Sequence, residues 1–137
     1  MAPKPTVAGR VFGQPSTRKG ILTWGRLMSR KTHELKDGIT GIGRRPAMGE
    51  ELPAIDNDID LPVNEDILVG DEYMSRRSAM ITSTGDGGFK LTFLHSANPV
   101  YFNGEERQTG ESIYPNDGDQ FKLGRTVFTF RIKKQEP

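Results

Sequence analysis

Hydrophobic and polar residues alternate with a period of two over several short stretches of the chain. The alternation is strict in Phe89–Phe93, and in Val127–Ile132 the residues Phe128, Phe130 and Ile132 share one side. Shorter apolar stretches are Ile67–Val69, Ser78–Thr82 and Phe121–Leu123. No segment sustains a helical period, so the pattern predicts an all-β chain.

Turn residues separate these stretches at short intervals. Asn103-Gly104 lies between Val100–Phe102 and Glu105–Arg107, and this dipeptide supplies the positive φ angles of a tight hairpin turn. A second turn is expected at Pro115–Gly118. About ten short strands at this spacing are typical of a β-sandwich.

The segment that follows Leu22 and Trp24 carries a weaker pattern. Gly25–Lys31 is predicted as a strand around Leu27, and Ile39 and Ile42 are expected to bracket a glycine-rich turn.

Composition divides the chain into one domain and a tail. Residues 1–20 are rich in proline, glycine and basic residues, and are expected to form a flexible N-terminal tail. Residues 21–134 are expected to form the β-sandwich. Within it, residues 45–66 contain many carboxylates and few apolar residues, which predicts a long acidic surface loop or insertion.

The charge balance narrows the possible partners. The chain has 19 Lys and Arg residues against 18 Asp and Glu residues, a net charge of +1, which argues against nucleic-acid binding by bulk electrostatics. A weaker hypothesis is that the basic residues of 1–31 contact anionic polymers. With no apolar run of the ~18 residues that span a membrane and no visible signal peptide, we expect a cytoplasmic protein without membrane contact.

Metal, cofactor and catalytic sites are not expected. The chain has no cysteine and no Gly-x-Ser-x-Gly motif, and its two histidines, His33 and His95, lie in different segments. The chain is therefore predicted not to be an enzyme and to need no cofactor.

Two partial motifs in the sequence lack residues that a calcium loop or a nucleotide-binding loop requires. Asp56-Asn-Asp58-Ile-Asp60 opens like a calcium loop, but Leu61 and Ile67 stand where such a loop needs glycine and glutamate. Gly41-Ile-Gly43 is followed by Pro46, which would fit poorly in the helix of a nucleotide-binding loop.

Four polar blocks, in order along residues 21–132, resemble the forkhead-associated (FHA) domain. The family pattern has Gly-Arg after a strand, then Ser-Arg-x-His before an apolar strand, then Ser-x-Asn-Gly-Thr leading to Asn-Gly, and finally Gly-Asp before paired strands. The corresponding blocks here are Gly43-Arg44, Asp71–Ile81 with Ser75-Arg76-Arg77-Ser78, Ser96–Gly104 with Asn98 and Asn103-Gly104, and Tyr114–Gly124.

The resemblance implies an FHA-type β-sandwich of about eleven strands with a loop-borne binding site. It also implies that Arg44 and Ser75 hold the phosphate of a phosphothreonine, that Arg76 adds contacts to it, and that Asn98 fixes the main chain of the bound peptide. The residues expected to support this site are Gly43, Arg77, Ser78, Asn103 and Gly104. An arginine fork and a serine hydroxyl suit a phosphate, which has about two negative charges and several acceptor oxygens.

The chain departs from the family pattern at four positions. Ser78 replaces the histidine that braces the site, Ala97 stands where many members carry threonine, and Pro99-Val100 replaces Gly-Thr. The leading hypothesis is a phosphopeptide-binding adaptor that recognises phosphothreonine-containing segments. The alternative is an FHA-fold interaction module that binds its partners independently of phosphorylation. The sequence does not predict the oligomeric state.

Overall fold

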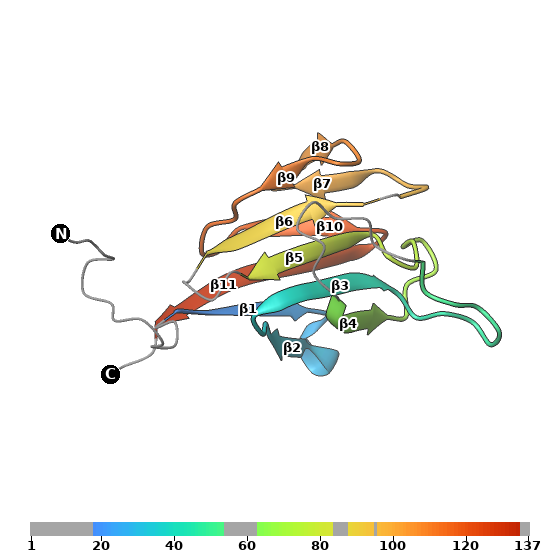
Figure 1. The fold of residues 1–137 in the computed structure, drawn as a ribbon, viewed down its shortest axis with the longest axis horizontal. Helices are drawn as coiled ribbons and strands as arrows, with labels where there is room; N and C mark the ends of the chain where they lie inside the picture. Colours follow the sequence, from blue (N-terminus) through green and yellow to red (C-terminus); the bar gives the residue numbers. More distant parts are fainter. Residues whose placement is uncertain (1–17, 54–62, 84–87, 95, 135–137) are drawn as a thin grey trace.

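The computed structural model describes residues 18–53, 63–83, 88–94 and 96–134, which form a two-sheet β-sandwich (Figure 1). The all-β prediction is confirmed: the described residues form eleven strands and a single 3-10 helix. In chain order these elements are β1 Arg18–Trp24, η1 Leu27–Ser29, β2 Lys31–Glu34, β3 Gly38–Arg44, β4 Val63–Val69, β5 Ala79–Ser83, β6 Phe89–Phe93, β7 Val100–Phe102, β8 Glu105–Arg107, β9 Ser112–Ile113, β10 Gln120–Leu123 and β11 Thr126–Lys134.

One sheet has six strands in the order β2-β1-β11-β10-β7-β8, and the other has five in the order β4-β3-β5-β6-β9. Every pairing is antiparallel except that of β3 with β4, which is parallel. The long connection after β3 follows from this arrangement, since two parallel neighbours cannot be joined by a tight turn.

The core lies between the two sheets and is built from the alternating side chains of the strands. Phe121 stacks on Phe128 at 5.1 Å between ring centroids, and Phe89 meets Phe130 edge to face at 5.3 Å. Trp24 packs against Phe128 at 5.4 Å and closes the cluster near the end of β1. These ring pairs add to the burial energy of the apolar strands.

The alternating segments and the hairpin were predicted correctly. Phe89–Phe93 is β6, and Asn103 and Gly104 take φ angles of 49° and 84° between β7 and β8. The phenylalanines of β11 face the core, as the period-two pattern predicts.

Two local assignments differ from the sequence expectation. The segment Gly25–Lys31, predicted as a strand, is a turn that contains η1, and the strand β2 begins at its end. β2 is an edge strand of its sheet, and its exposed side chains are polar, as is usual at a sheet edge. The predicted turn between Ile39 and Ile42 is the middle of β3, a strand whose inner residues are buried on both faces and so show no alternation.

The structure also moves two of the predicted boundaries, those of the N-terminal tail and of the acidic loop. Arg18–Gly20, placed in the tail by composition, are the first residues of β1 and pair with Ile132–Lys134. Val63–Asp66, placed in the acidic loop, belong to β4, where Asp66 and Glu65 have partners inside the fold. Residues 1–17 lie outside the described part of the chain.

Candidate functional site

Arg44 is the last residue of β3, which lies between β4 and β5 in the five-stranded sheet. Its backbone N–H donates to the carbonyl of Ser75 at 2.9 Å, so the end of the strand is tied to the segment that precedes β5. Gly43 permits this approach, because a Cβ at that position would stand 1.9 Å from the carbonyl oxygen of Arg76. Gly43 therefore brings Arg44, Ser75 and Arg76 together at one end of the sandwich.

Asp71 fixes the segment that carries Ser75 and Arg76. Its carboxylate accepts hydrogen bonds from the backbone N–H groups of Tyr73 (2.9 Å) and Arg125 (2.7 Å) and from the hydroxyl of Thr126 (2.7 Å). Burial alone would raise the pKa of Asp71, but these hydrogen bonds and the Arg125 charge outweigh it, so the pKa lies below its ordinary value. The Arg125 guanidinium also lies 3.7 Å from the centre of the Tyr73 ring.

The 96–99 turn packs beside this segment. The backbone N–H of Ala97 donates to the Ser75 hydroxyl at 3.3 Å, and the Asn98 side-chain amide donates to the Tyr73 carbonyl at 2.8 Å. The contact with Tyr73 joins two loops at the same end of the sandwich as Arg44. Asn98 is also exposed to solvent. The four residues predicted to contact a phosphopeptide, Arg44, Ser75, Arg76 and Asn98, are therefore neighbours in the structure.

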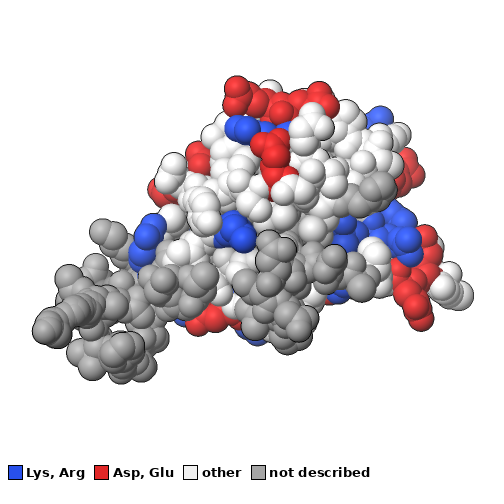
Figure 2. Space-filling model, turned by 45° about the horizontal axis from the view of Figure 1, so that its top comes forward, with Lys and Arg blue, Asp and Glu red and all other residues white. Residues whose placement is uncertain are grey.

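The guanidinium of Arg44 is already paired with a carboxylate. Its Nη1 and Nη2 donate to Oε1 and Oε2 of Glu50 at 3.0 and 3.3 Å, a two-pronged contact. Hydrogen bonds from Arg44 and from the backbone N–H of Ala47 lower the pKa of Glu50 to about 2, and the Glu50 partner raises the pKa of Arg44. At this end of the molecule, basic and acidic surfaces lie in direct contact (Figure 2).

The neighbouring arginines contact the same loop. Arg76 Nη1 donates to the carbonyl of Glu51 at 2.7 Å, and Arg77 Nη1 donates to the carbonyl of Pro53. Arg77 also forms a two-pronged pair with Asp66 on β4, at 3.0 and 2.7 Å, with only 13% of its side chain exposed. Arg77 thus anchors β4 and the loop end rather than facing solvent beside Arg44.

Ser78 lies in the core rather than at the surface beside Arg44. It is fully buried, and its hydroxyl makes no hydrogen bond with any described residue. Its backbone pairs with Ile42 and Leu94, so the position holds the start of β5 between the two neighbouring strands. At the position of the family histidine, this chain therefore has a small side chain with an unsatisfied polar atom.

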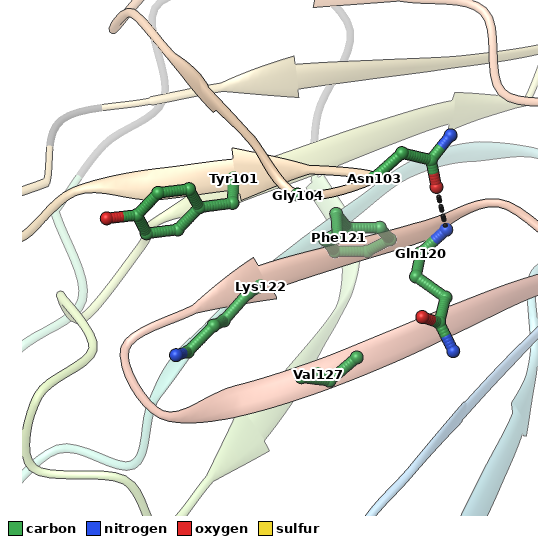
Figure 3. A pocket seen from close by; sticks show the side chains of 7 residues that line it. All are labelled: Tyr101, Asn103, Gly104, Gln120, Phe121, Lys122 and Val127. Carbon is green, nitrogen blue, oxygen red and sulfur yellow. Dashed lines mark hydrogen bonds between the residues drawn. The ribbon is translucent and has the colours of Figure 1, made fainter.

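Asn103 and Gly104 lie at another place, on the six-stranded sheet. The Asn103 side chain accepts the backbone N–H of Gln120 at 2.8 Å and donates to Asp119 at 3.1 Å, so it braces the β7–β8 turn against β10. Both residues line a hollow of about 340 Å³ on β7, β10 and β11 (Figure 3). The other residues that line it are Tyr101, Gln120, Phe121, Lys122 and Val127.

The remaining sequence candidates fall outside this end of the sandwich. His33 on β2 contacts Glu65 on β4 at 2.9 Å and joins the edges of the two sheets. His95 and the partial calcium motif at Asp56–Asp60 lie outside the described residues. Within the described ranges there is no group of three potential metal-ligating side chains, and no helix there is long and apolar enough to cross a membrane.

Sequence reasoning did not anticipate Glu50 as a partner of Arg44. The available signal was an acidic residue a few positions after Arg44, at the start of a loop rich in carboxylates. Tyr73 and Arg125, which pack together beside the Asn98 contact, also carried no recognisable pattern.

Solved structures with the same fold include several FHA domains. The FHA domain of FhaA, complexed with the intracellular domain of Rv3910, is 24% identical with a TM-score of 0.59, over 82% of this chain and 99% of that one. A domain from a structural and functional study of phosphothreonine-dependent FHA interactions is 24% identical with a TM-score of 0.60, over 87% and 98%. The yeast splicing factor Pml1 is 17% identical with a TM-score of 0.67, over 88% and 84%.

A comparison with curated proteins found no match. The family comparison, in contrast, covers more than half of the chain and includes Arg44, Ser75, Arg76 and Asn98. The model described as FHA domain matches residues 40–124, and the chain therefore belongs to the FHA domain family.

Proposed function

We propose that this chain is a phosphopeptide-binding adaptor module that recognises phosphothreonine-containing protein segments and catalyses no reaction. The observation that carries the proposal is the clustering of Arg44, Ser75, Arg76 and Asn98 on adjoining loops. An arginine fork, a hydroxyl and an exposed amide at one place match the acceptor oxygens of a phosphate and the main chain of a peptide.

The contact between Arg44 and Glu50 supports the proposed function, because it shows that Arg44 can bind an anion with both terminal nitrogens. Both terminal nitrogens of Arg44 engage a planar anion at 3.0 and 3.3 Å, so the guanidinium is oriented to hold two oxygens of one ligand group. The Glu50 carboxylate occupies the position that two phosphate oxygens would take.

Relatives of the same fold give the proposal its biological context. One was studied for phosphothreonine-dependent FHA interactions, and another forms a complex with an intracellular domain of a second protein. A protein partner carrying phosphothreonine is therefore the ligand that we propose. A cytoplasmic location stays a prediction.

The experiment is a fluorescence-anisotropy titration of a degenerate phosphothreonine peptide library and its unphosphorylated twin. The wild type should bind only the phosphorylated library, and Arg44→Ala or Ser75→Ala should remove that binding while the fold survives. Arg131→Ala is the matched control, because Arg131 is an exposed arginine on β11 that pairs with Asp117 at 3.9 Å. Unchanged affinity in Arg44→Ala would refute the proposal.

A second candidate is phosphorylation-independent binding by the same fold. It is favoured by the fact that Arg44, Arg76 and Arg77 already have partners in the chain, and by Ser78 in place of the histidine. Equal binding of the two libraries would establish this alternative.

A further inference from the structure

The loop after β3 holds a carboxylate on the arginine that we propose for phosphate binding. The turn Ala47–Glu50 is closed by two hydrogen bonds, from Glu50 N to the Ala47 carbonyl (2.9 Å) and from Ala47 N to Glu50 Oε1 (2.7 Å). Together with the fork of Arg44, these contacts give the Glu50 carboxylate three donors. The chain thus supplies its own anionic ligand to Arg44.

The loop is fastened on both sides of Glu50. The backbone N–H of Arg45 donates to Val69 at 2.8 Å, and Arg76 holds the Glu51 carbonyl at 2.7 Å. Because both ends are attached, the carboxylate is delivered to Arg44 at a high effective concentration. The Arg44 and Glu50 side chains are still 26% and 35% exposed, so an external ligand can reach the pair.

We propose that Glu50 is an internal competitor for Arg44, and that the ligands able to displace it are phosphothreonine segments with basic residues beside the phosphothreonine. This inference rests on the proposed function. The phosphate would replace Glu50 as the partner of Arg44. A basic side chain of the ligand would then pair with the Glu50 carboxylate that is released.

The charges around the site favour this exchange. Arg44, Arg45 and Arg76 lie on the same two segments as Glu50, Glu51 and Glu72, and the sum of these six charges is zero. A bound phosphate adds close to two negative charges. A ligand without basic residues would leave that excess unpaired, whereas Lys or Arg in the ligand would neutralise it.

Occupation of the site by Glu50 lowers the affinity of every competing anion. A protein whose binding-competent state is populated only in part binds with an apparent affinity reduced by that fraction. Removing the Glu50 charge should therefore tighten the binding of a phosphopeptide that carries no basic residue. It should also remove the gain in affinity that basic residues give a peptide, because the Glu50 carboxylate with which they would pair is gone.

The test uses two phosphothreonine peptides, one with arginines on both sides of the phosphothreonine and one with alanines there. Both are titrated against wild type, Glu50→Gln and the control Glu51→Gln, whose side chain is not paired with Arg44. We expect the arginine peptide to bind wild type about fivefold more tightly than the alanine peptide, the upper range for an exposed ion pair. In Glu50→Gln the alanine peptide should bind severalfold more tightly than in wild type, and the difference between the peptides should shrink.

Two results would overturn the inference alone. One is phosphate-dependent binding of the alanine peptide that is no tighter in Glu50→Gln. The other is an arginine advantage of the same size in wild type and Glu50→Gln. Absence of phosphate-dependent binding in both proteins would instead overturn the proposed function, and this inference with it.

Discussion

Gly43 and Arg76 approach each other so closely that no other residue fits at position 43. A Cβ there would stand 1.9 Å from the Arg76 carbonyl oxygen and 2.4 Å from its carbonyl carbon, both backbone atoms. Close packing of backbone on backbone cannot be relieved by a side-chain rotation. The glycine before Arg44 is therefore a steric requirement of the site, separate from the charge chemistry of its arginines.

Gly43→Ala should lower the free energy of unfolding by about 3 kcal/mol, the upper range for overpacking, because the 75–77 segment must move away from β3. Urea unfolding measures this effect. Gly70→Ala is the control, since its nearest contact would be the Arg45 guanidinium at an ordinary 3.5 Å. Equal stability of the two variants would contradict the close approach of Gly43 to the Arg76 backbone.

Sequence patterns predicted those elements whose conformation depends on a few neighbouring residues. The alternation in Phe89–Phe93 and the Asn103-Gly104 turn each depend on a few neighbouring residues, and both were correct. The interior of β3 gave no such signal. Gly41 leaves room there for the Asp66 side chain, since a Cβ at position 41 would stand 2.3 Å from an Asp66 carboxylate oxygen, a contact with a residue far along the chain.

The candidate site was predictable to the same extent. The order of the polar blocks predicted that Arg44, Ser75, Arg76 and Asn98 would be neighbours, and the described loops bring them together. That they bind a phosphate stays a prediction. The Arg44–Glu50 contact depends on the path of a loop between parallel strands, which no sequence period encodes.

Ser78→Ala should leave the protein equally stable or stabilise it by about 1 kcal/mol, because it removes a buried hydroxyl without a partner among the described residues. Ser83→Ala is the matched control at the other end of β5, where the hydroxyl donates to Asp37 at 3.2 Å. That variant should lose about 1 kcal/mol. Thermal or urea unfolding of both proteins tests the pair, and a clear loss in Ser78→Ala would show that its hydroxyl has a partner.

Asp71→Asn should destabilise the protein by about 2 kcal/mol at neutral pH, because the amide cannot accept all three hydrogen bonds of the carboxylate. Since the pKa of Asp71 is lowered from 3.8, its contribution in the wild type is complete above that value and is lost as the pH falls through the lowered pKa. Urea unfolding between pH 7 and pH 3 should therefore show a larger fall in stability in the wild type than in Asp71→Asn. Parallel curves would mean that Asp71 is not the group responsible.

The carboxyl of Glu50 should titrate at about 2 in the wild type, well below the ordinary 4.5. Side-chain carbon chemical shifts followed over pH by NMR report the value directly. In Arg44→Ala the pKa should rise toward 4.5, because the first cause of the shift is the hydrogen bond from Arg44, while Ala47 N–H continues to hold it slightly low. Since the pKa is depressed, the contact with Arg44 is complete above pH 4.5 and is lost only as the pH falls through about 2. Arg131→Ala should leave the titration unchanged, and a Glu50 pKa near 4.5 in the wild type would mean that the loop does not hold its carboxylate on Arg44 in solution.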